Sequence, residues 1–282
     1  MKVSVILLTY NSEQYLEKAI TNLYQISDDI NAVDSFSSDD TIKILKSYNI
    51  HFIQHEFVTY SQQRNWAIKN IATKYNWQFH IDSGEFLSDD LIESISSLSE
   101  ENLSGIHGIM IQRLVIFLNK KIIHGGMTPI WHLRLFRSGY GRCEEKKYDQ
   151  HFIVEGKTIK IKGYIIDNVC TSLSEFIIRH NRWSDLEADD ILSEPRNKNN
   201  KKDVIKGKLF GNKIERKRWW KEKYNSLPLF IRPYLLFFYR YIIKLGILDG
   251  IEGLIFFTLQ TFWFRFLIDS KIYERRQLIK QK

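Results

Sequence analysis

The sequence predicts an α/β fold in which a mostly parallel sheet is flanked by helices and followed by a basic helical extension. Short apolar stretches alternate with helix-like stretches over about the first 90 residues, a pattern typical of βαβ units. Polar loops follow several of these apolar stretches, and the chain beyond residue 212 is rich in basic and aromatic residues. We therefore expect a sheet domain at residues 1–192, a linker at 193–212 and a helical extension at 213–282.

Four short stretches are predicted to be the parallel strands. Val3–Leu8 is almost continuously apolar, as expected for a strand that is buried on both faces. The next strands are predicted at Ile30–Val33 and His51–Ile53, and the fourth ends at Asp82. Because crossover connections in βαβ units are right-handed, the carboxyl ends of these strands share one edge of the sheet.

Helices are predicted between the strands from the spacing of apolar residues and from residues that favour a helix start. Ser12 is expected to cap the first helix, and Ser88 the helix after the fourth strand. A further helix is expected over about Gln63–Tyr75. These helices would flank the sheet and connect its strands.

Three polar loops follow predicted strands at the shared edge. They are Thr9-Tyr10-Asn11, Asp34-Ser35 and Asp82-Ser83-Gly84-Glu85. Ligands of open α/β sheets bind outside the carboxyl ends of the strands, so the three loops predict a ligand site. Asp and Gly are also ordinary turn formers, but turn chemistry explains one such loop more easily than three.

The loops lack the sequences that usually hold phosphates in α/β proteins. Neither Gly-x-Gly-x-x-Gly nor Gly-Lys-Ser/Thr follows the first strand. Tyr10 is suited to stack on a base, Asp34 to accept from a base or a ribose, and Asp82 to reach the ribose. Asp82 and Glu85 together are suited to hold a hard divalent cation beside a diphosphate.

The net charge of +8 is concentrated at the C-terminal end. Residues 201–282 hold 19 Lys and Arg and 7 Asp and Glu, a balance of +12 that leaves −4 on residues 1–200. Such a basic stretch predicts an anionic partner, either nucleic acid or a membrane. Because Leu, Ile and Phe are concentrated among the basic residues, an anionic membrane surface is favoured and nucleic acid is not expected.

Two apolar helices are predicted in the extension, at residues 234–245 and 254–268. Charged residues interrupt both, and neither holds the roughly 18–20 uninterrupted apolar residues that span a bilayer. We expect them to lie in the headgroup plane. The alternative is that they cap the sheet domain or form a dimer interface.

Six motifs, taken in order, resemble those of a known enzyme family. They are VSVILLTYN (3–11), VDSFSSDDT (33–41), QQRNWAI (62–68), HIDSGEFLS (80–88), WHLRLFR (131–137) and KYDQHF (147–152). Their order and spacing resemble the family 2 glycosyltransferases of the GT-A fold, in the branch that builds bacterial surface polysaccharides such as lipopolysaccharide, capsule and exopolysaccharide. The resemblance continues into residues 232–274.

The resemblance implies an inverting sugar transfer from a UDP- or GDP-linked donor to a glycan or lipid-linked acceptor. It also implies a peripheral location on the cytoplasmic face of the inner or plasma membrane; the short first apolar run is not a secretory signal. Two alternatives remain open. A nucleotidyltransferase of related fold usually has a Gly-rich, Arg-containing loop after the first strand, which is absent here. A non-catalytic, membrane-associated nucleotide-sugar-binding protein is the other.

The resemblance also implies roles for individual residues. The residues that would bind the donor are Thr9, Tyr10, Asn11, Asp34, Arg64 and Asp82, and those that would bind Mg²⁺ or Mn²⁺ are Asp82 and Glu85. The acceptor and diphosphate side would be lined by Trp131, Arg134 and His151. Asp149 would be the catalytic base. The chain departs from the family pattern at Gly84, where a second metal-binding carboxylate is usual, and at Gln150, where an acid is usual.

Three of these residues have an equally plain structural interpretation. Arg64 would pair a helix with the carboxylate loop, Arg134 would lie on a solvated strand face, and His151 would be a buried histidine. The alternation in residues 131–137 predicts Trp131, Leu133 and Leu135 on one face of a strand, with Arg134 on the other.

Overall fold

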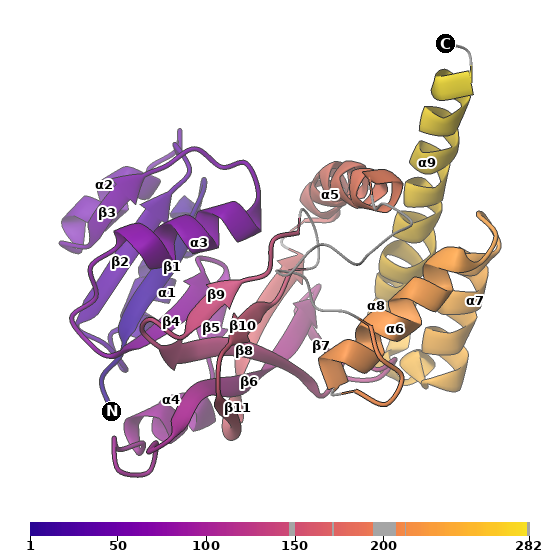
Figure 1. Ribbon diagram of the computed structural model, residues 1–282. Helices are drawn as coiled ribbons and strands as arrows, with labels where there is room; N and C mark the ends of the chain where they lie inside the picture. The colour runs from indigo at the N-terminus through magenta and orange to yellow at the C-terminus, as the bar shows by residue number, and fades with distance from the viewer. Residues whose placement is uncertain (147–149, 171, 194–206, 212, 281–282) are drawn as a thin grey trace. The chain divides into compact units, whose positions relative to one another are not determined.

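The computed structural model describes residues 1–146, 150–170, 172–193, 207–211 and 213–280 (Figure 1). They form two compact units, the first made of residues 1–116, 128–143 and 150–169 and the second of residues 117–127, 144–149 and 170–282. The predicted base Asp149 and most of the predicted linker at 193–212 lie outside the described residues.

The first unit contains most of the strands and four helices. The strands of the structure are β1 (Ser4–Thr9), β2 (Asp29–Asp34), β3 (His51–Gln54), β4 (Trp77–Asp82), β5 (Glu85–Leu87), β6 (Ile106–Phe117), β7 (Lys120–Ile122), β8 (Ile130–Arg137), β9 (Gly141–Cys143), β10 (Phe152–Val154) and β11 (Lys157–Cys170). The helices of this unit are α1 (Glu13–Leu23), α2 (Thr41–Ser47), α3 (Tyr60–Asn70) and α4 (Asp89–Ser96).

The large sheet is mixed, with strand order β3-β2-β1-β4-β8-β6-β11-β5. The four predicted strands β3, β2, β1 and β4 are parallel. Beyond them, β8 pairs antiparallel with both β4 and β6, and β5 pairs antiparallel with β11. The predicted α/β class is confirmed. The βαβ pattern of the sequence predicted the parallel strands of the sheet.

Apolar clusters cover both faces of the parallel strands. Leu16 of α1 and Leu91 of α4 belong to one cluster with Leu7 of β1. On the other face, Ala67 of α3 packs with Ile6 of β1. Because successive strand residues point to opposite faces, a strand covered on both sides is apolar at nearly every position, as β1 is.

The structure confirms one predicted helix start and moves another. The Ser88 hydroxyl accepts a hydrogen bond from the Leu91 N–H over 3.3 Å, so Ser88 caps α4 as predicted. The helix predicted over Gln63–Tyr75 instead runs from Tyr60 to Asn70. The reason is an unforeseen cap, because the Thr59 hydroxyl accepts from the Gln62 N–H over 3.2 Å.

A β-bulge in β8 overturns the predicted alternation of residues 131–137. Leu135 pairs with Ile109 and Leu133 with Met110, so the register skips Arg134. An extra residue in a strand moves the side chains on one side of it to the opposite face of the sheet. Leu133 therefore joins the cluster of Phe136, while Leu135 belongs to the main core on the other face.

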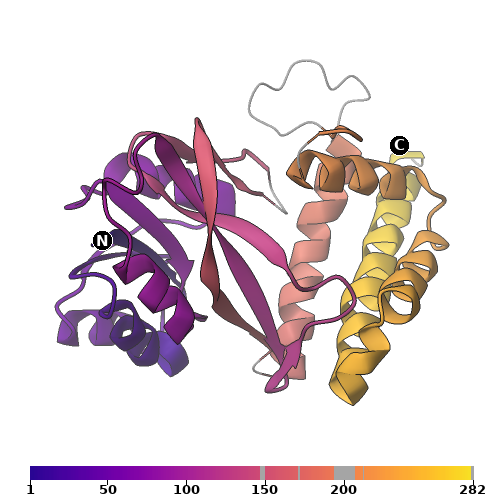
Figure 2. The same ribbon diagram turned by 90° about the horizontal axis from the view of Figure 1, so that it is seen from below.

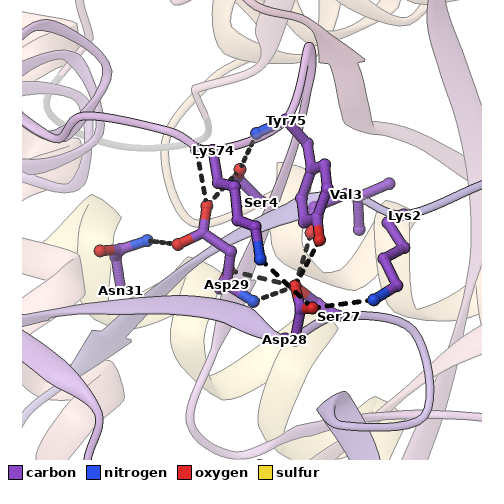
Figure 3. A network of polar contacts seen from close by, with 9 residues as sticks. All are labelled: Lys2, Val3, Ser4, Ser27, Asp28, Asp29, Asn31, Lys74 and Tyr75. Carbon is purple, nitrogen blue, oxygen red and sulfur yellow. Dashed lines mark hydrogen bonds and ion pairs between the residues drawn. The ribbon is translucent and has the colours of Figure 1, made fainter.

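A polar network joins the amino-terminal ends of the parallel strands (Figure 3). Asp29 of β2 accepts from the Ser4 hydroxyl of β1 over 2.5 Å and from the Lys74 N–H before β4 over 2.8 Å. Asp28 accepts from Lys2 over 2.8 Å and from the Tyr75 hydroxyl over 2.5 Å. The network fixes the strands against one another at the edge opposite the polar loops, since parallel strands all begin at one edge.

The second unit is helical. Its helices are α5 (Leu173–Ser193), α6 (Lys213–Ser226), α7 (Arg232–Phe238), α8 (Gly250–Phe257) and α9 (Phe264–Lys280). α5 and α9 pack side by side (Figure 2), and Ala188 of α5 is buried in one cluster with Ile268 and Ile272 of α9. Two ion pairs reinforce this contact, Lys271 with Asp185 at 2.7 Å and Arg275 with Asp189 at 2.6 Å.

The helix containing residues 254–268 is longer than predicted. A π-helical turn at Thr258–Trp263 joins α8 directly to α9. Within the described ranges, Gly246–Lys280 is one helical run that is long and apolar enough to cross a membrane, judged by length and composition alone. The sequence-based expectation of two short segments is therefore wrong for the second one.

Candidate active site

The three predicted polar loops lie together at the carboxyl edge of the parallel strands. Thr9 of β1 is in register with Asp34 of β2, and Asp82 ends β4 on the other side of β1. The hydroxyls of Ser12 and Ser83 lie 2.7 Å apart and join the first loop to the third. Ser12 precedes α1 as predicted, but its hydroxyl makes no capping hydrogen bond.

Asp34 is fully buried and connects the loops. Its carboxylate accepts hydrogen bonds from the Thr9 hydroxyl at 3.0 Å, the Ser37 N–H at 2.9 Å and the Gln54 side-chain amide at 3.1 Å. The residues that follow β1 and β2 are thereby held in one arrangement. The base-binding role of Asp34 stays a prediction, and in this structure its oxygens bind protein groups.

Two exposed aromatic rings follow neighbouring strands at this edge. Tyr10 and Phe36 are each 57% exposed. Asn11 joins the two loops that hold these rings. Its N–H donates to the Ser37 hydroxyl over 2.9 Å, and its side-chain oxygen accepts from the Ser38 N–H over 2.9 Å. Tyr10 is the predicted stacking residue, whereas Phe36 was not among the predicted site residues.

Phe36 also has an unusual backbone. Its φ of 57° lies in the left-handed region, where a bulky side chain is uncommon. Such strained residues cluster at functional sites. The sequence offered one signal that could have identified Phe36 as a candidate site residue. It is an aromatic residue inside a serine-rich loop that directly follows a strand.

Arg64 of α3 is buried and pairs with the carboxylate loop. One guanidinium nitrogen bonds Asp82, and another donates to the Ile81 carbonyl over 3.4 Å. The neighbouring Gln63 donates to the Ser35 hydroxyl over 3.2 Å and so connects the same helix to the second loop. The contacts of Arg64 match its structural interpretation, and its role toward a donor stays a prediction.

Glu85 and Arg134 form a second buried ion pair. Their closest nitrogen and oxygen atoms lie 2.8 Å apart, and the other Glu85 oxygen accepts from the Asp82 N–H over 3.0 Å. Burial raises the pKa of Glu85 to about 7, although the charge of Arg134 opposes the rise. Arg134 reaches this position as the bulged residue of β8, and bulges commonly redirect a side chain near active sites.

A third pair and a neutral histidine complete the charged network. Arg113 of β6 donates to Asp167 over 2.6 Å, and Asp167 is the register partner of Glu85 across β5 and β11. His80 of β4 is fully buried, and burial together with the charges of Arg64 and Arg134 lowers its pKa well below the usual value. The network thus has three guanidinium groups and three carboxyl groups around a neutral imidazole.

The predicted acceptor-side residues lie on β8 and next to β10. The Lys160 ammonium lies 4.9 Å from the ring centre of Trp131. The ring of His151 is nearly parallel to that of His132, with centroids 6.3 Å apart. His132 was not among the predicted site residues, yet its ring is the neighbour of one.

The residues of the carboxylate loop do not fit a divalent cation held by Asp82 and Glu85. Both Glu85 oxygens bind protein groups, one Asp82 oxygen binds Arg64, and Gly84 has no side chain. Within the described residues, no three His, Cys, Asp or Glu side chains gather in a way that could hold a metal ion. In this structure both predicted metal ligands are partners of arginines, and their role toward a metal stays a prediction.

Comparison with known proteins identifies the family. The model of glycosyl transferase family 2 matches residues 4–149, more than half of the chain. An uncharacterized glycosyltransferase of Rickettsia typhi is 24% identical over 250 residues, which cover 84% of this chain and 79% of that protein.

Solved structures of similar topology include S. aureus TarS 1–349 in complex with UDP-GlcNAc. It is 13% identical, with a TM-score of 0.45, and the match covers 98% of this chain and 92% of that one. Glucosyl-3-phosphoglycerate synthase of Mycobacterium tuberculosis, in complex with Mn²⁺, UDP and glucosyl-3-phosphoglycerate, is 17% identical with a TM-score of 0.32, covering 40% of this chain and 44% of that one. By the match of the family model, this chain belongs to glycosyl transferase family 2.

Proposed function

We propose that the protein transfers a sugar, with inversion, from a UDP- or GDP-linked donor to a glycan or lipid-linked acceptor of a cell-surface polysaccharide. The observation that carries this proposal is the junction of three loops at the carboxyl edge of the parallel strands, with exposed Tyr10 beside it. Ligands bind at this edge in open α/β sheets. In this proposal the base of the donor stacks on the Tyr10 ring, and the diphosphate lies next to the carboxylate loop and its arginines.

The proposed reaction needs one base. The acceptor oxygen attacks the anomeric carbon, the nucleoside diphosphate leaves with the electron pair of the broken carbon–oxygen bond, and the acceptor proton passes to the base. We assign this role to Asp149, the acid in the segment Asp149-Gln150-His151. His151 would orient that base or contact the diphosphate.

A panel of UDP- and GDP-sugars tests the proposal. A bound donor raises the melting temperature by mass action, and each stabilising donor is then assayed for nucleoside diphosphate release. Asp149→Asn should lower turnover by about 10²-fold or more while leaving the donor-induced shift intact. Asp90→Asn, an exposed carboxylate paired with Lys162, should leave both unchanged.

The outcomes separate the candidate functions. Stabilisation by a donor without any turnover would favour the non-catalytic binding protein. Absence of both stabilisation and turnover across the panel would overturn the proposed donor class. Unchanged turnover of Asp149→Asn would remove Asp149 as the base.

We also propose that the second unit holds the enzyme on an anionic membrane surface. Large apolar and aromatic side chains between residues 234 and 254 are exposed, and together we call them the tip surface. They are Tyr234, Leu235, Phe238, Tyr239, Ile242, Ile243, Leu245, Ile247, Leu248, Ile251 and Leu254. Large contiguous apolar patches are rare on soluble monomers and mark interaction sites, which is why this gathering of exposed apolar side chains in one short stretch supports the proposal.

The charges around the tip surface favour anionic lipid. Lys244 is exposed within it, whereas Asp249 is buried and accepts from the His124 N–H over 3.0 Å. Glu252 is paired with Lys120 at 3.0 Å. Basic residues beside apolar helices bind anionic headgroups.

The geometry favours a surface location over a membrane-spanning one. The second half of the long helix, α9, is fixed to α5 by the ion pairs of Lys271 and Arg275. These charges would be costly in hydrocarbon. The apolar half with the tip surface can enter the interface while α9 stays in the protein.

Vesicle binding tests the tip surface with a matched control. Leu248→Glu/Ile251→Glu should reduce sedimentation with phosphatidylglycerol-containing vesicles by about tenfold or more, because two exposed apolar side chains that would enter the membrane interface are replaced by anions. Leu278→Glu/Ile279→Glu makes the same change on exposed residues at the far end of α9 and should have little effect. Equal losses in both variants would contradict the proposal. A wild-type dimer that the tip variant dissociates would favour the dimer interface instead.

A further inference from the structure

We infer that the site offsets the charge of the donor diphosphate with its own arginines and works without a divalent cation on the Asp82–Glu85 loop. This inference rests on the proposed sugar transfer and specifies how its donor site is charged. It differs from the usual pattern of the family, in which acidic side chains of this loop bind the cation.

The first support is that the acidic groups of the loop are already neutralised. Asp82 bonds Arg64, and Glu85 lies 2.8 Å from Arg134. Glu85 is only 3% exposed, and its second oxygen accepts from the Asp82 N–H. A cation would have to compete with two buried guanidinium groups for these oxygens, which leaves it little to bind.

The second support is the supply of positive charge. Arg64 of α3 bonds Asp82, Arg134 of β8 pairs with Glu85, and Arg113 of β6 pairs with Asp167, the register partner of Glu85. Guanidinium groups suit diphosphate oxygens as well as carboxylates. A guanidinium has five N–H donors, more than one carboxylate contact uses, so a diphosphate can share these groups.

The third support is that packing does not explain the missing ligand at Gly84. A Cβ added there meets no atom within 4 Å, and the Gly84 backbone is not among those with positive φ. An L-residue therefore fits without strain. Packing therefore leaves room for an aspartate at this position.

Installing the carboxylate gives a direct binding test. In full-length protein without donor, Mn²⁺ binding is measured by electron paramagnetic resonance for wild type, Gly84→Asp and Gly84→Asn. We expect no stoichiometric site in the wild type or in Gly84→Asn, and at least tenfold tighter binding in Gly84→Asp, where Asp82 gains a carboxylate neighbour. A stoichiometric wild-type site that Asp82→Asn removes would overturn the inference.

Chelation gives the functional test. Turnover and donor-induced stabilisation of the wild type should change less than about twofold between excess EDTA and added Mn²⁺. Loss of turnover in EDTA that Mn²⁺ restores would overturn the inference. If no donor of the panel is turned over under any condition, the proposed function fails, whereas the Mn²⁺ titrations of the three proteins still decide whether the loop holds a cation.

Discussion

Replacement of Arg134 by methionine tests the buried charge pair beside the candidate site. Methionine retains an apolar chain but removes the guanidinium that lies 2.8 Å from the Glu85 carboxylate. Glu85 is 3% exposed, so solvent cannot replace the lost partner. Removal of one member of a buried ion pair costs about 3–5 kcal/mol, and we expect a loss of this size at pH 8.

The loss should depend on pH in a defined direction. Burial already raises the pKa of Glu85 to about 7, and loss of Arg134 raises it further. Between these two pKa values the folded variant holds a proton that the folded wild type has released. The wild type therefore gains stability relative to the variant as pH rises above about 7, by at most about 1.4 kcal/mol per pH unit. The destabilisation should be smaller at pH 6 than at pH 8.

Urea unfolding followed by circular dichroism at both pH values measures the effect. Arg137→Met is the matched control on the same strand, because its partner Glu100 is 55% exposed and such pairs contribute about 1 kcal/mol or less. The double variant Glu85→Gln/Arg134→Met should recover at least half of the loss. An Arg134→Met variant no less stable than Arg137→Met at pH 8, or additive effects in the double variant, would refute the reasoning.

Three further predictions concern the base pocket and the second unit. Tyr10→Ala should weaken donor binding about 5- to 150-fold in titration calorimetry, because stacking on a base contributes about 1–3 kcal/mol, while Tyr24→Ala, directly after α1, should not change it. Asp269→Asn should lower the unfolding free energy by about 3–5 kcal/mol, since it leaves the buried Arg232 guanidinium without its carboxylate at 2.5 Å; a loss below about 1 kcal/mol would contradict that. Burial lowers the pKa of His180 to about 4, so the unfolded chain binds the extra proton and stability rises with pH between about 4 and 6.5. The melting temperature of His180→Gln should show less of this rise than that of the wild type.

The parallel half of the sheet was predictable because its signal is local. β1 is apolar throughout since both of its faces are covered, and the intervening helices have regular apolar spacing. The antiparallel pairing of the later strands and the true start of α3 were not predictable in the same way. The Thr59 cap competes with other polar residues nearby, and only the tertiary contacts of α3 select it.

The position of the candidate site was predictable, but the pairing of its charges was not. Topology alone brings Thr9, Asp34 and Asp82 to one edge. The sequence separates Glu85 from Arg134 by 49 residues, and nothing local indicates that they meet. The contacts of Asp82 and Glu85 with Arg64 and Arg134 were not predicted because the two arginines were considered apart from the two carboxylates.

The bulge in β8 has a consequence for how the sheet and the site depend on each other. Without Arg134, Leu133 and Leu135 would become neighbours in an uninterrupted ladder opposite Met110 and Ile109, with both side chains still on their present faces. The strand pairing therefore has no need of this residue. Deleting it would keep the ladder but would leave the Glu85 carboxylate buried without its guanidinium. The bulged residue thus contributes to stability through its charge pair and not through strand pairing.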